Sequence, residues 1–484
     1  MFRSKQLSLS DVYADCLDTF DNDKPGFLSM LEQNIDIDAL IPLSFRRNFH
    51  AWTGRPREHP LTGFVWALLI QRIFSIPTDS LLIIFLRFSK ELREFCGFTK
   101  VPDASKFTRF KQKFLPDFKD MFDRLVDLTE PICAEIDPKL AAMTIFDTSG
   151  IEAYVTENNP KYANSLIRSM KAWKEAKSLS DSFDPYKAAY AAMPSCAASE
   201  PAVKQLYING HFCYVYKFGM ITNGLGIVRD IAFYDETFLA AHPEIEVGKK
   251  SDSPDEDKSL GDSKALIPTL SGFFARHPQI RPDVFLGDSA FDTIDIYAGL
   301  LKDLEFNKAF IPLSARSDSK YPDCNIDELG RPCCPKNPKL PMKREGSKSH
   351  LRCGRPSMKF VCPRMKWVME DGKPKRRTSC EDPCTDSPCG RMFYIYPEKD
   401  LRTFPGTVRG TDEWNAAYKV RTIAERTICH FKDSLLVSGR KTRNAQTLHA
   451  DLLLSGITQL ITVLLADKIN RRQYIRSLKP LIAA

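Results

Sequence analysis

Apolar residues recur every three to four positions along the first 130 residues of the chain, which is the spacing of a helix face. The pattern is clearest in residues 59–76, 78–98 and 103–136, with polar residues typical of helix N-termini at Thr62, Thr78 and Asp103. We therefore predict a helical N-terminal domain over residues 1–130. Basic residues alternate with phenylalanines in 105–113, which fits a small DNA-binding module and equally fits a helical bundle with a solvated basic face.

The pattern changes after residue 131. A short apolar run, "MTIF", precedes Asp147, and Gly150 follows, which predicts a strand that stops and turns. Residues 207–235 predict consecutive strands with turns at Asn209-Gly210 and Asn223-Gly224.

Further along, residues 262–278 predict a helix, and residues 282–314 predict a strand, an acidic turn, a helix and another strand. The polar residues 156–204 predict a helical arm or insertion. This mixture of strands and crossing helices predicts an α/β core whose first part spans 131–315.

Residues 316–390 interrupt the α/β pattern. They are rich in Pro, Cys and Lys and lack a helical period, so we interpret them as an insertion. The second part of the core, 391–484, begins with a strand-like segment and continues with helices. Its most apolar run, Leu452–Ala466, contains several polar residues and is too short to span a bilayer, which predicts a buried helix.

Composition and charge narrow the class of protein. The chain has 484 residues, 43% of them hydrophobic, which is ordinary for a globular protein. Lys and Arg outnumber Asp and Glu by 69 to 61, a net charge of +8 that is compatible with a polyanionic partner. The first residues carry no secretory pattern, so we expect a cytoplasmic protein with no membrane partner and with thiols or metal ligands among its 14 cysteines.

Three acidic residues stand at informative places. Asp147 and Asp288 each follow an apolar run, and Glu425 lies within a predicted helix. Carboxylates brought together from distant parts of a chain repel one another, so such a cluster implies a cation, and hard oxygen ligands suit Mg²⁺ or Mn²⁺. Each acid taken singly also fits an ordinary turn or surface residue.

The segment "YKVRTIAERTICHFK" (418–432) predicts an amphipathic helix. At about 100° per residue, Tyr418, Arg421, Glu425 and Lys432 lie within about 60° of one another, and the apolar residues lie on the opposite side. A solvated face with an Arg421–Glu425 ion pair also fits this wheel. A surface stripe held by ion pairs does not account for Tyr418, because a phenol takes no part in such pairs.

The spacing Tyr418-x2-Arg421-x3-Glu425-x6-Lys432 resembles the Y-R-E-K signature of insertion-sequence transposases that have an RNase H-like DDE core. The segments "FDTSG" and "GDSAFD" resemble the blocks around the first and second acids of that family, at Asp147 and Asp288. The resemblance covers about residues 40–465. It implies an α/β fold with an RNase H-like mixed sheet flanked by helices, a helical N-terminal domain, and a Cys-rich basic insertion before the last catalytic helix.

The resemblance also implies roles. Asp147, Asp288 and Glu425 would hold two Mg²⁺ or Mn²⁺ ions, and Tyr418, Arg421 and Lys432 would contact phosphates of the transposon end. The implied reaction is cleavage of a phosphodiester by water, followed by attack of the freed 3′-OH on target DNA. The implied partner is double-stranded DNA, bound by a homodimer that is associated with the bacterial nucleoid when it is active.

Eight of the 14 cysteines lie between residues 324 and 389: Cys324, Cys333, Cys334, Cys353, Cys362, Cys380, Cys384 and Cys389. Their clustering among turn residues predicts either a structural zinc site or free thiols in a loosely packed segment. Cys353, Cys362, Cys380, Cys384 and Cys389 are the candidate zinc ligands, although their spacing is irregular.

The same segment is strongly basic. Residues 336–377 contain 14 Lys and Arg against 3 Asp and Glu, more positive charge than the whole chain carries net. Such a segment is typical of a surface that binds backbone phosphate, and a solvated loop is the alternative. Trp367 lies within it and fits either base stacking or packing.

We therefore expect a metal-dependent DDE transposase. A transposase-derived DNA-binding protein without catalysis and a metal-dependent DNA nuclease are the alternatives.

Overall fold

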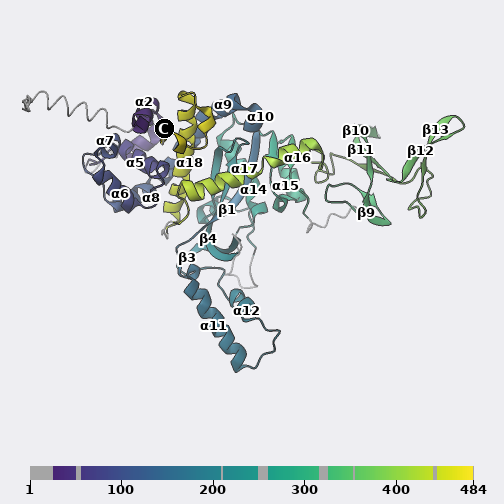
Figure 1. Ribbon diagram of the computed structural model, residues 1–484, viewed down its shortest axis with the longest axis horizontal. Helices are drawn as coiled ribbons and strands as arrows, with labels where there is room; N and C mark the ends of the chain where they lie inside the picture. The colour runs from purple at the N-terminus through teal and green to yellow at the C-terminus, as the bar shows by residue number, and fades with distance from the viewer. Residues whose placement is uncertain are drawn as a thin grey trace, which may run out of the picture.

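A mixed seven-stranded β-sheet forms the centre of the protein (Figure 1). The computed structural model describes residues 26–50, 56–208, 211–248, 260–314, 325–352, 355–439 and 444–482. The strands are β1 (Met143–Glu152), β2 (Cys196–Ala197), β3 (Glu200–Ile208), β4 (His211–Thr222), β5 (Val228–Phe233), β6 (Val284–Leu286) and β7 (Lys308–Phe310). Their order is β2-β3-β4-β1-β6-β7, and β5 also pairs with β4.

The strand β1 joins the two halves of this sheet. On one side it pairs antiparallel with β4, from Ile145 opposite Thr222 to Glu152 opposite Val215. On the other side it pairs in parallel with β6 only as far as Ile145, and β6 in turn pairs in parallel with β7. The α/β prediction is confirmed as a mixed sheet covered by helices.

The prediction that the first strand stops at Asp147 is wrong. β1 continues to Glu152 because β4 remains hydrogen-bonded beside it, and Gly150 lies in the strand opposite Lys217 rather than in a turn. The turn at Asn223-Gly224 is confirmed: Asn223 Oδ1 accepts from the amides of Leu225 and Ile227. The predicted turn at Asn209-Gly210 lies outside the described residues.

The N-terminal part is helical, as the apolar spacing predicts. Its helices are α2 (Gly26–Asn34), α3 (Ile37–Leu40), α4 (Leu43–Phe49), α5 (Leu61–Ile73), α6 (Asp79–Phe88), α7 (Lys90–Phe95), α8 (Ala104–Lys113), α9 (Leu115–Ile136) and α10 (Pro138–Ala141). Thr78 caps α6 and Asp103 caps α8 through side-chain bonds to backbone amides. Thr62 caps no helix, because α5 already begins at Leu61, directly after Pro60.

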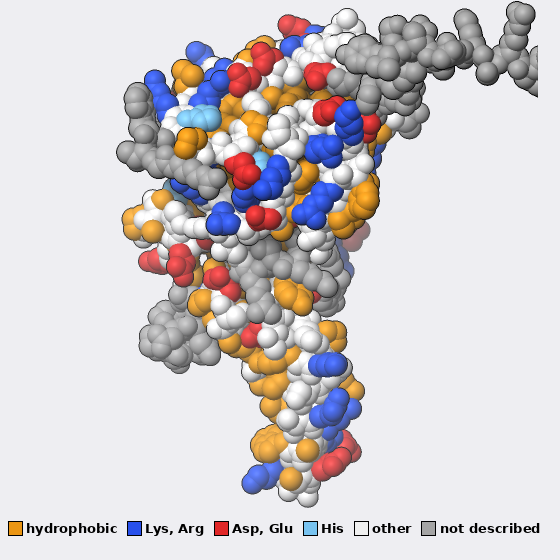
Figure 2. All heavy atoms as spheres, turned by 90° about the vertical axis from the view of Figure 1, so that its left-hand side faces the viewer, with side chains coloured by type: hydrophobic (Ala, Val, Ile, Leu, Met, Phe, Trp, Pro, Cys, Tyr) orange, Lys and Arg blue, Asp and Glu red, His pale blue; other side chains and the backbone are white. Residues whose placement is uncertain are grey.

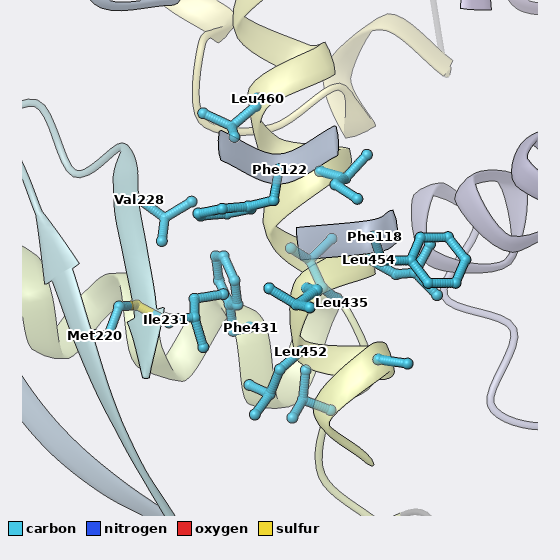
Figure 3. Packing of buried hydrophobic residues seen from close by; sticks show 14 of the residues in the cluster. Phe118, Phe122, Met220, Val228, Ile231, Phe431, Leu435, Leu452, Leu454 and Leu460 are labelled. Carbon is cyan, nitrogen blue, oxygen red and sulfur yellow. The ribbon is translucent and has the colours of Figure 1, made fainter. Parts of the chain in front are cut away.

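The helix α18 (Ala445–Lys468) packs between these N-terminal helices and the sheet. Figure 3 shows Phe118 and Phe122 of α9 beside residues of α18, with Val228 and Ile231 of β5 on the side of Phe122. The buried helix predicted at 452–466 is confirmed, and it is longer than predicted. Its length and apolar composition would suffice to cross a membrane, but 89% of its apolar window is buried inside the fold, as in a core helix.

A buried ion-pair network joins the N-terminal helices to α18. Arg72 of α5 donates to Asp451 Oδ1 at 2.7 Å, and the Lys111 ammonium lies 3.3 Å from the same oxygen and 2.9 Å from Asp79. Lys111 is therefore a buried structural residue and not part of a solvated basic face. Phe107 and Phe110, which alternate with it, are buried in the core.

The face of the molecule that carries these N-terminal helices has a mixed surface. Figure 2 shows basic, acidic and apolar side chains interspersed there, without a single large basic patch. Within the predicted DNA-binding stretch, the half-buried Lys106 pairs with Glu58 at 2.9 Å. These contacts favour the helical-bundle interpretation of residues 105–113.

Two segments project from the core (Figure 1). The polar stretch 156–204, predicted as an arm, begins with the short turn η1 (Thr156–Asn158) and forms α11 (Pro160–Ala176) and α12 (Pro185–Ala191), whose side chains are mostly exposed. The prediction is wrong for the end of this stretch, which forms β2 and the start of β3 in the main sheet. The Cys-rich insertion forms small sheets with strands β8 (Cys333–Cys334), β9 (Asn337–Pro341), β10 (Lys343–Arg352), β11 (Arg355–Val361), β12 (Met365–Glu370), β13 (Lys373–Thr378) and β14 (Met392–Ile395).

The insertion reaches further than residue 390. The strand predicted after that point is β14, and it pairs with β11 of the insertion rather than with the main sheet. The remaining elements are α13 (Glu236–Ala241), α14 (Asp262–Arg276), η2 (Ser289–Phe291), α15 (Ile294–Ala298), η3 (Gly299–Asp303), α16 (Asp412–Lys419), α17 (Thr422–Cys429), η4 (His430–Ser434), η5 (Arg472–Tyr474) and α19 (Lys479–Ile482).

Candidate active site

Asp147 lies on β1, just past the point where the parallel pairing with β6 ends. Alternate residues of a strand share one face, so Asp147 follows Ile145 on the same side of the sheet. Ile145 packs there against Leu286, Phe310, Trp414 and Ala424. Asp147 is therefore directed toward α16 and α17, which supply Trp414 and Ala424.

Asp288 stands just beyond the end of β6, as predicted. It caps the short turn η2 by accepting the amide of Ala290 at 2.8 Å. Asp292, at the other end of this turn, is buried and forms a two-point ion pair with Arg402, with its second oxygen accepting the amide of Ser314. These contacts of Asp292 fix the position of the turn that carries Asp288.

The predicted helix 418–432 is present as α16, α17 and the π-helical turn η4, with a break at Val420 and Arg421. Its apolar side is buried as predicted: Ala424, Thr427 and Phe431 are at most 6% exposed. The helix α17 packs against β1 and β4, which brings its polar side to Asp147 within β1 and to Asp288 just beyond β6.

The guanidinium of Arg421 lies between all three acidic residues. Its Nη2 atom is 3.6 Å from Asp147 Oδ2 and 3.7 Å from Asp288 Oδ2, and its Nη1 atom donates to Glu425 Oε1 at 2.5 Å. The three acids that the sequence singled out are therefore neighbours in space. Arg421 was expected to face phosphate, and in this structure it faces the acids.

The positive charge of Arg421 does not neutralise the negative charge of the three acids. The pKa of Asp147 is raised to about 6, chiefly by burial; Asp288 and Glu425 contribute to the rise, and Arg421 opposes it. Burial also raises the pKa of Asp288. Three carboxylates beside one guanidinium leave two negative charges, so the cluster has room for additional positive charge.

The chemistry of the donor set fits a divalent cation, but the geometry is not that of a formed metal site. Among the described residues, no three His, Cys, Asp or Glu side chains stand close enough together to hold an ion. In this structure Arg421 separates the carboxylates of Asp147, Asp288 and Glu425. Binding of a metal ion at this place therefore requires the guanidinium to move.

Tyr418 and Lys432 flank the acids on either side. The ring of Tyr418 stacks on Trp414, with centroids 4.7 Å apart, and burial raises the pKa of its phenol. The Lys432 ammonium donates to Ser149 Oγ at 2.7 Å, two residues beyond Asp147 on the same face of β1. Burial lowers the pKa of Lys432.

Comparison with known proteins adds a family match. Residues 15–113 match the profile of a family described as "Transposase domain (DUF772)". The match is to a transposase domain. Within the described residues it covers α2–α8, so it includes none of the three acids.

A solved structure described as the cryo-EM structure of a piggyBac transposase synaptic complex with hairpin DNA aligns with 95% of this chain and 80% of that chain. The sequence identity is 11% and the TM-score is 0.36, which does not establish a shared fold. No significant match was found among curated proteins.

The candidate zinc ligands lie in the insertion, and one of them, Cys353, is outside the described residues, as is Cys324 of the same Cys-rich segment. Cys362 is buried, and Cys380, Cys384 and Cys389 are half-buried thiols. Burial and the nearby thiol of Cys334 raise the pKa of Cys384. In the described part of the insertion, no three of these cysteines form a set that could hold a metal.

The basic charge of the insertion is partly balanced internally. Glu345 pairs with Lys359 and Arg376, and Glu370 pairs with Arg377. Trp367 is 59% exposed and lies under the guanidinium of Arg376, 4.7 Å from its ring centroid. The exposed ring is therefore held in place by a cation–π contact.

Three residues of the site were missed in the sequence. Ser149 follows Asp147 by two positions, so strand alternation could have placed it on the same face. Trp414 precedes Tyr418 by four positions, which is one helical turn. Asp262, which accepts from Thr148 Oγ1 at 2.7 Å and lies 2.5 Å from Lys217, gave no sequence signal.

Proposed function

We propose that this protein is a DDE transposase of the insertion-sequence type, which cleaves DNA at the ends of an element and joins the freed 3′-OH to target DNA. The observation that carries the proposal is the convergence of Asp147, Asp288 and Glu425 on the single guanidinium of Arg421. These acids come from β1, the end of β6 and α17. The transposase domain matched by residues 15–113 supports the same function.

The strand order supports an RNase H-like core. Antiparallel strands β5, β4 and β1 are continued by the parallel strands β6 and β7, and the two acids on the sheet lie where β1 and β6 meet. The helix with Glu425 crosses that same point. A site assembled at the junction of the antiparallel and parallel halves agrees with the fold that the Y-R-E-K resemblance implies.

Asp147, Asp288 and Glu425 would hold two Mg²⁺ or Mn²⁺ ions. When bound, such ions polarise the phosphodiester and favour the ionised form of the attacking oxygen. The pKa of Asp147 is raised to about 6 because burial and the neighbouring acids disfavour its ionised form. An added positive charge would stabilise that ionised form, which supports the proposal.

The three basic and phenolic groups would bind DNA phosphates. Tyr418 is held by its stack on Trp414, and Lys432 is held by Ser149, so both are oriented beside the acids. Arg421 would turn from the acids to a phosphate as the metal ions take its place. Charge-assisted contacts of this kind fix the position of the DNA and are insensitive to its sequence.

The basic insertion would add contacts to the DNA backbone, with the steep salt dependence typical of phosphate neutralisation. We propose double-stranded DNA as the partner and a homodimer as the DNA-bound form, because an element has two ends that must be brought to one target.

The test is an assay with the DNA that flanks the coding region, Mg²⁺ and a target plasmid. Joined products are expected. Cleavage without joining would instead favour a metal-dependent nuclease, and binding without cleavage would favour a DNA-binding protein that has lost catalysis.

A further inference from the structure

A cavity of about 180 Å³ lies at the start of β1, at the opposite end of the parallel strands from the candidate active site. Its walls come from α9, α10, the end of β4, the start of β5, α14 and the segment before β6. Exposed residues at Ala134, Pro138, Gln279 and Arg281 surround its mouth.

Buried polar side chains line the inside of this cavity. Arg229 is 3% exposed, Asn223 is 1% exposed and Thr222 is fully buried. Within the described part of the chain, Arg229 Nε, Asn223 Nδ2 and Thr222 Oγ1 have no hydrogen-bond partner. Arg229 Nη2 and Glu130 Oε2 also lack a hydrogen bond, but they form an ion pair with each other. A buried donor without a partner costs free energy, so three such atoms around one cavity indicate an occupant that accepts hydrogen bonds.

The rest of each side chain is fixed, which keeps these donors in place. Arg229 Nη1 donates to Thr129 Oγ1 at 2.9 Å, and its Nη2 atom lies 3.1 Å from Glu130 Oε2. Asn223 Oδ1 already accepts from the amides of Leu225 and Ile227. The Nδ2 group of Asn223 is therefore the part of its amide that remains for a ligand.

We infer that this cavity binds a small oxyanion of the phosphate or carboxylate class. The partnerless atoms at Arg229 and Asn223 are donors, and Thr222 can also donate. The carboxylate of Glu130, whose Oε2 also lacks a hydrogen bond, is balanced by its ion pair with Arg229 Nη2 at 3.1 Å. Arg281 at the mouth leaves the cavity with one positive charge in excess. The Nε side of a guanidinium is suited to a planar or tetrahedral oxyanion.

The inference stands apart from the proposed DNA chemistry. None of the residues that line the cavity contacts Asp147, Asp288 or Glu425 in the interactions described above, so either conclusion can fail without the other.

Calorimetric titration of the full chain with inorganic phosphate, at constant ionic strength set by chloride, tests the inference. We expect saturable binding of about one phosphate at this cavity. Asn223→Asp keeps the oxygen that accepts from Leu225 and Ile227 but replaces the donor by a second, anionic oxygen. This variant should weaken phosphate binding at least tenfold, and Arg281→Gln should weaken it severalfold.

Arg168→Gln is the matched control, because it removes one exposed positive charge on the arm helix α11, which projects from the core (Figure 1) and does not line the cavity. Phosphate that binds generally to basic surface would respond equally to Arg168→Gln and Asn223→Asp, and that result would overturn the inference. So would the absence of saturable binding, or a crystal structure in saturating phosphate that shows only water in the cavity.

A 5′-phosphorylated oligonucleotide distinguishes the two sources of such an anion. If its binding falls with Asn223→Asp, the site takes the phosphate of a DNA end. If its binding is unchanged while that of free phosphate falls, the site takes a free oxyanion.

Discussion

Arg421 Nη2 lies 3.6 Å from Asp147 Oδ2, although the two residues are far apart in the sequence and belong to a helix and a strand. The same guanidinium reaches Asp288 and Glu425. In the absence of metal, Arg421 thus serves as the counterion of the three acids. Divalent ions and this guanidinium are therefore expected to compete for one place.

This competition predicts the behaviour of Arg421→Gln. Removing the guanidinium leaves the acids without a counterion, so the metal-free variant should melt at a lower temperature than the wild type. Mn²⁺ should bind to the variant about tenfold more tightly, equivalent to about 1.4 kcal/mol, since it no longer has to displace a positive charge. Thermal melting and calorimetry measure the two effects.

Arg426→Gln provides the control for that experiment, because Arg426 is exposed on the same helix α17. It should leave both quantities near their wild-type values. If Arg421→Gln binds Mn²⁺ no more tightly than the wild type, the guanidinium and the metal do not share a site.

The raised pKa of Asp147 predicts a pH dependence of metal binding. Burial raises this pKa to about 6, so the carboxyl is ionised above pH 6 and protonated below it. A proton competes with the metal, and Mn²⁺ affinity should fall by about tenfold per pH unit below pH 6. Calorimetry from pH 5 to pH 7 measures this, and affinity that is constant over this range would contradict it. The Asp147→Asn variant should bind Mn²⁺ weakly, and its affinity should not show this dependence on pH.

The buried pair between Arg72 and Asp451 predicts a loss of stability on substitution. Asp451 is 1% exposed and accepts from Arg72 at 2.7 Å. Asp451→Asn leaves Arg72 and Lys111 without their shared carboxylate, and the free energy of unfolding should fall by about 3–5 kcal/mol. Urea denaturation measures this change in the free energy of unfolding.

Asp467→Asn is the control, because Asp467 lies near the more exposed end of the same helix, and this variant should lower the free energy of unfolding far less. Equal losses in the two variants would show that the buried pair does not contribute more to stability than the more exposed residue.

The cysteines of the insertion predict either a structural zinc site or free thiols, and the two alternatives differ in metal content. Protein purified without chelator should contain about one zinc per chain by elemental analysis if its thiolates form a structural site. Cys380→Ser and Cys384→Ser should lose the metal, while Cys96→Ser, buried in the N-terminal helices, should retain it. Metal-free wild-type protein would leave these cysteines as free thiols.

Much of the fold could be predicted because its signals are local. The capping residues Thr78 and Asp103, the turn at Asn223 and the apolar face of the helix with Glu425 each follow from side chains within a few positions. The path of β1 could not, since its continuation past Asp147 depends on pairing with β4, a partner more than sixty residues away.

The candidate active site likewise has features that the sequence could predict and features that it could not. Spacing and family resemblance identified the three acids, and the structure brings them together around Arg421. The pairing of Arg421 with Glu425 follows from the helical wheel, but its approach to Asp147 and Asp288 depends on residues of other elements, which no helical wheel contains. The Lys432–Ser149 contact likewise joins two elements that meet only in the folded chain.

The most direct measurement of the central claim is strand joining by single variants, with DNA of the element ends and Mg²⁺. Asp147→Asn, Asp288→Asn and Glu425→Gln should each abolish cleavage and joining while leaving DNA binding within about twofold, because each replaces one of three carboxylates that act as a unit. Glu152→Gln, at the exposed end of β1, should remain active. If any one of the three variants still joins strands at the wild-type rate, these residues are not the catalytic site.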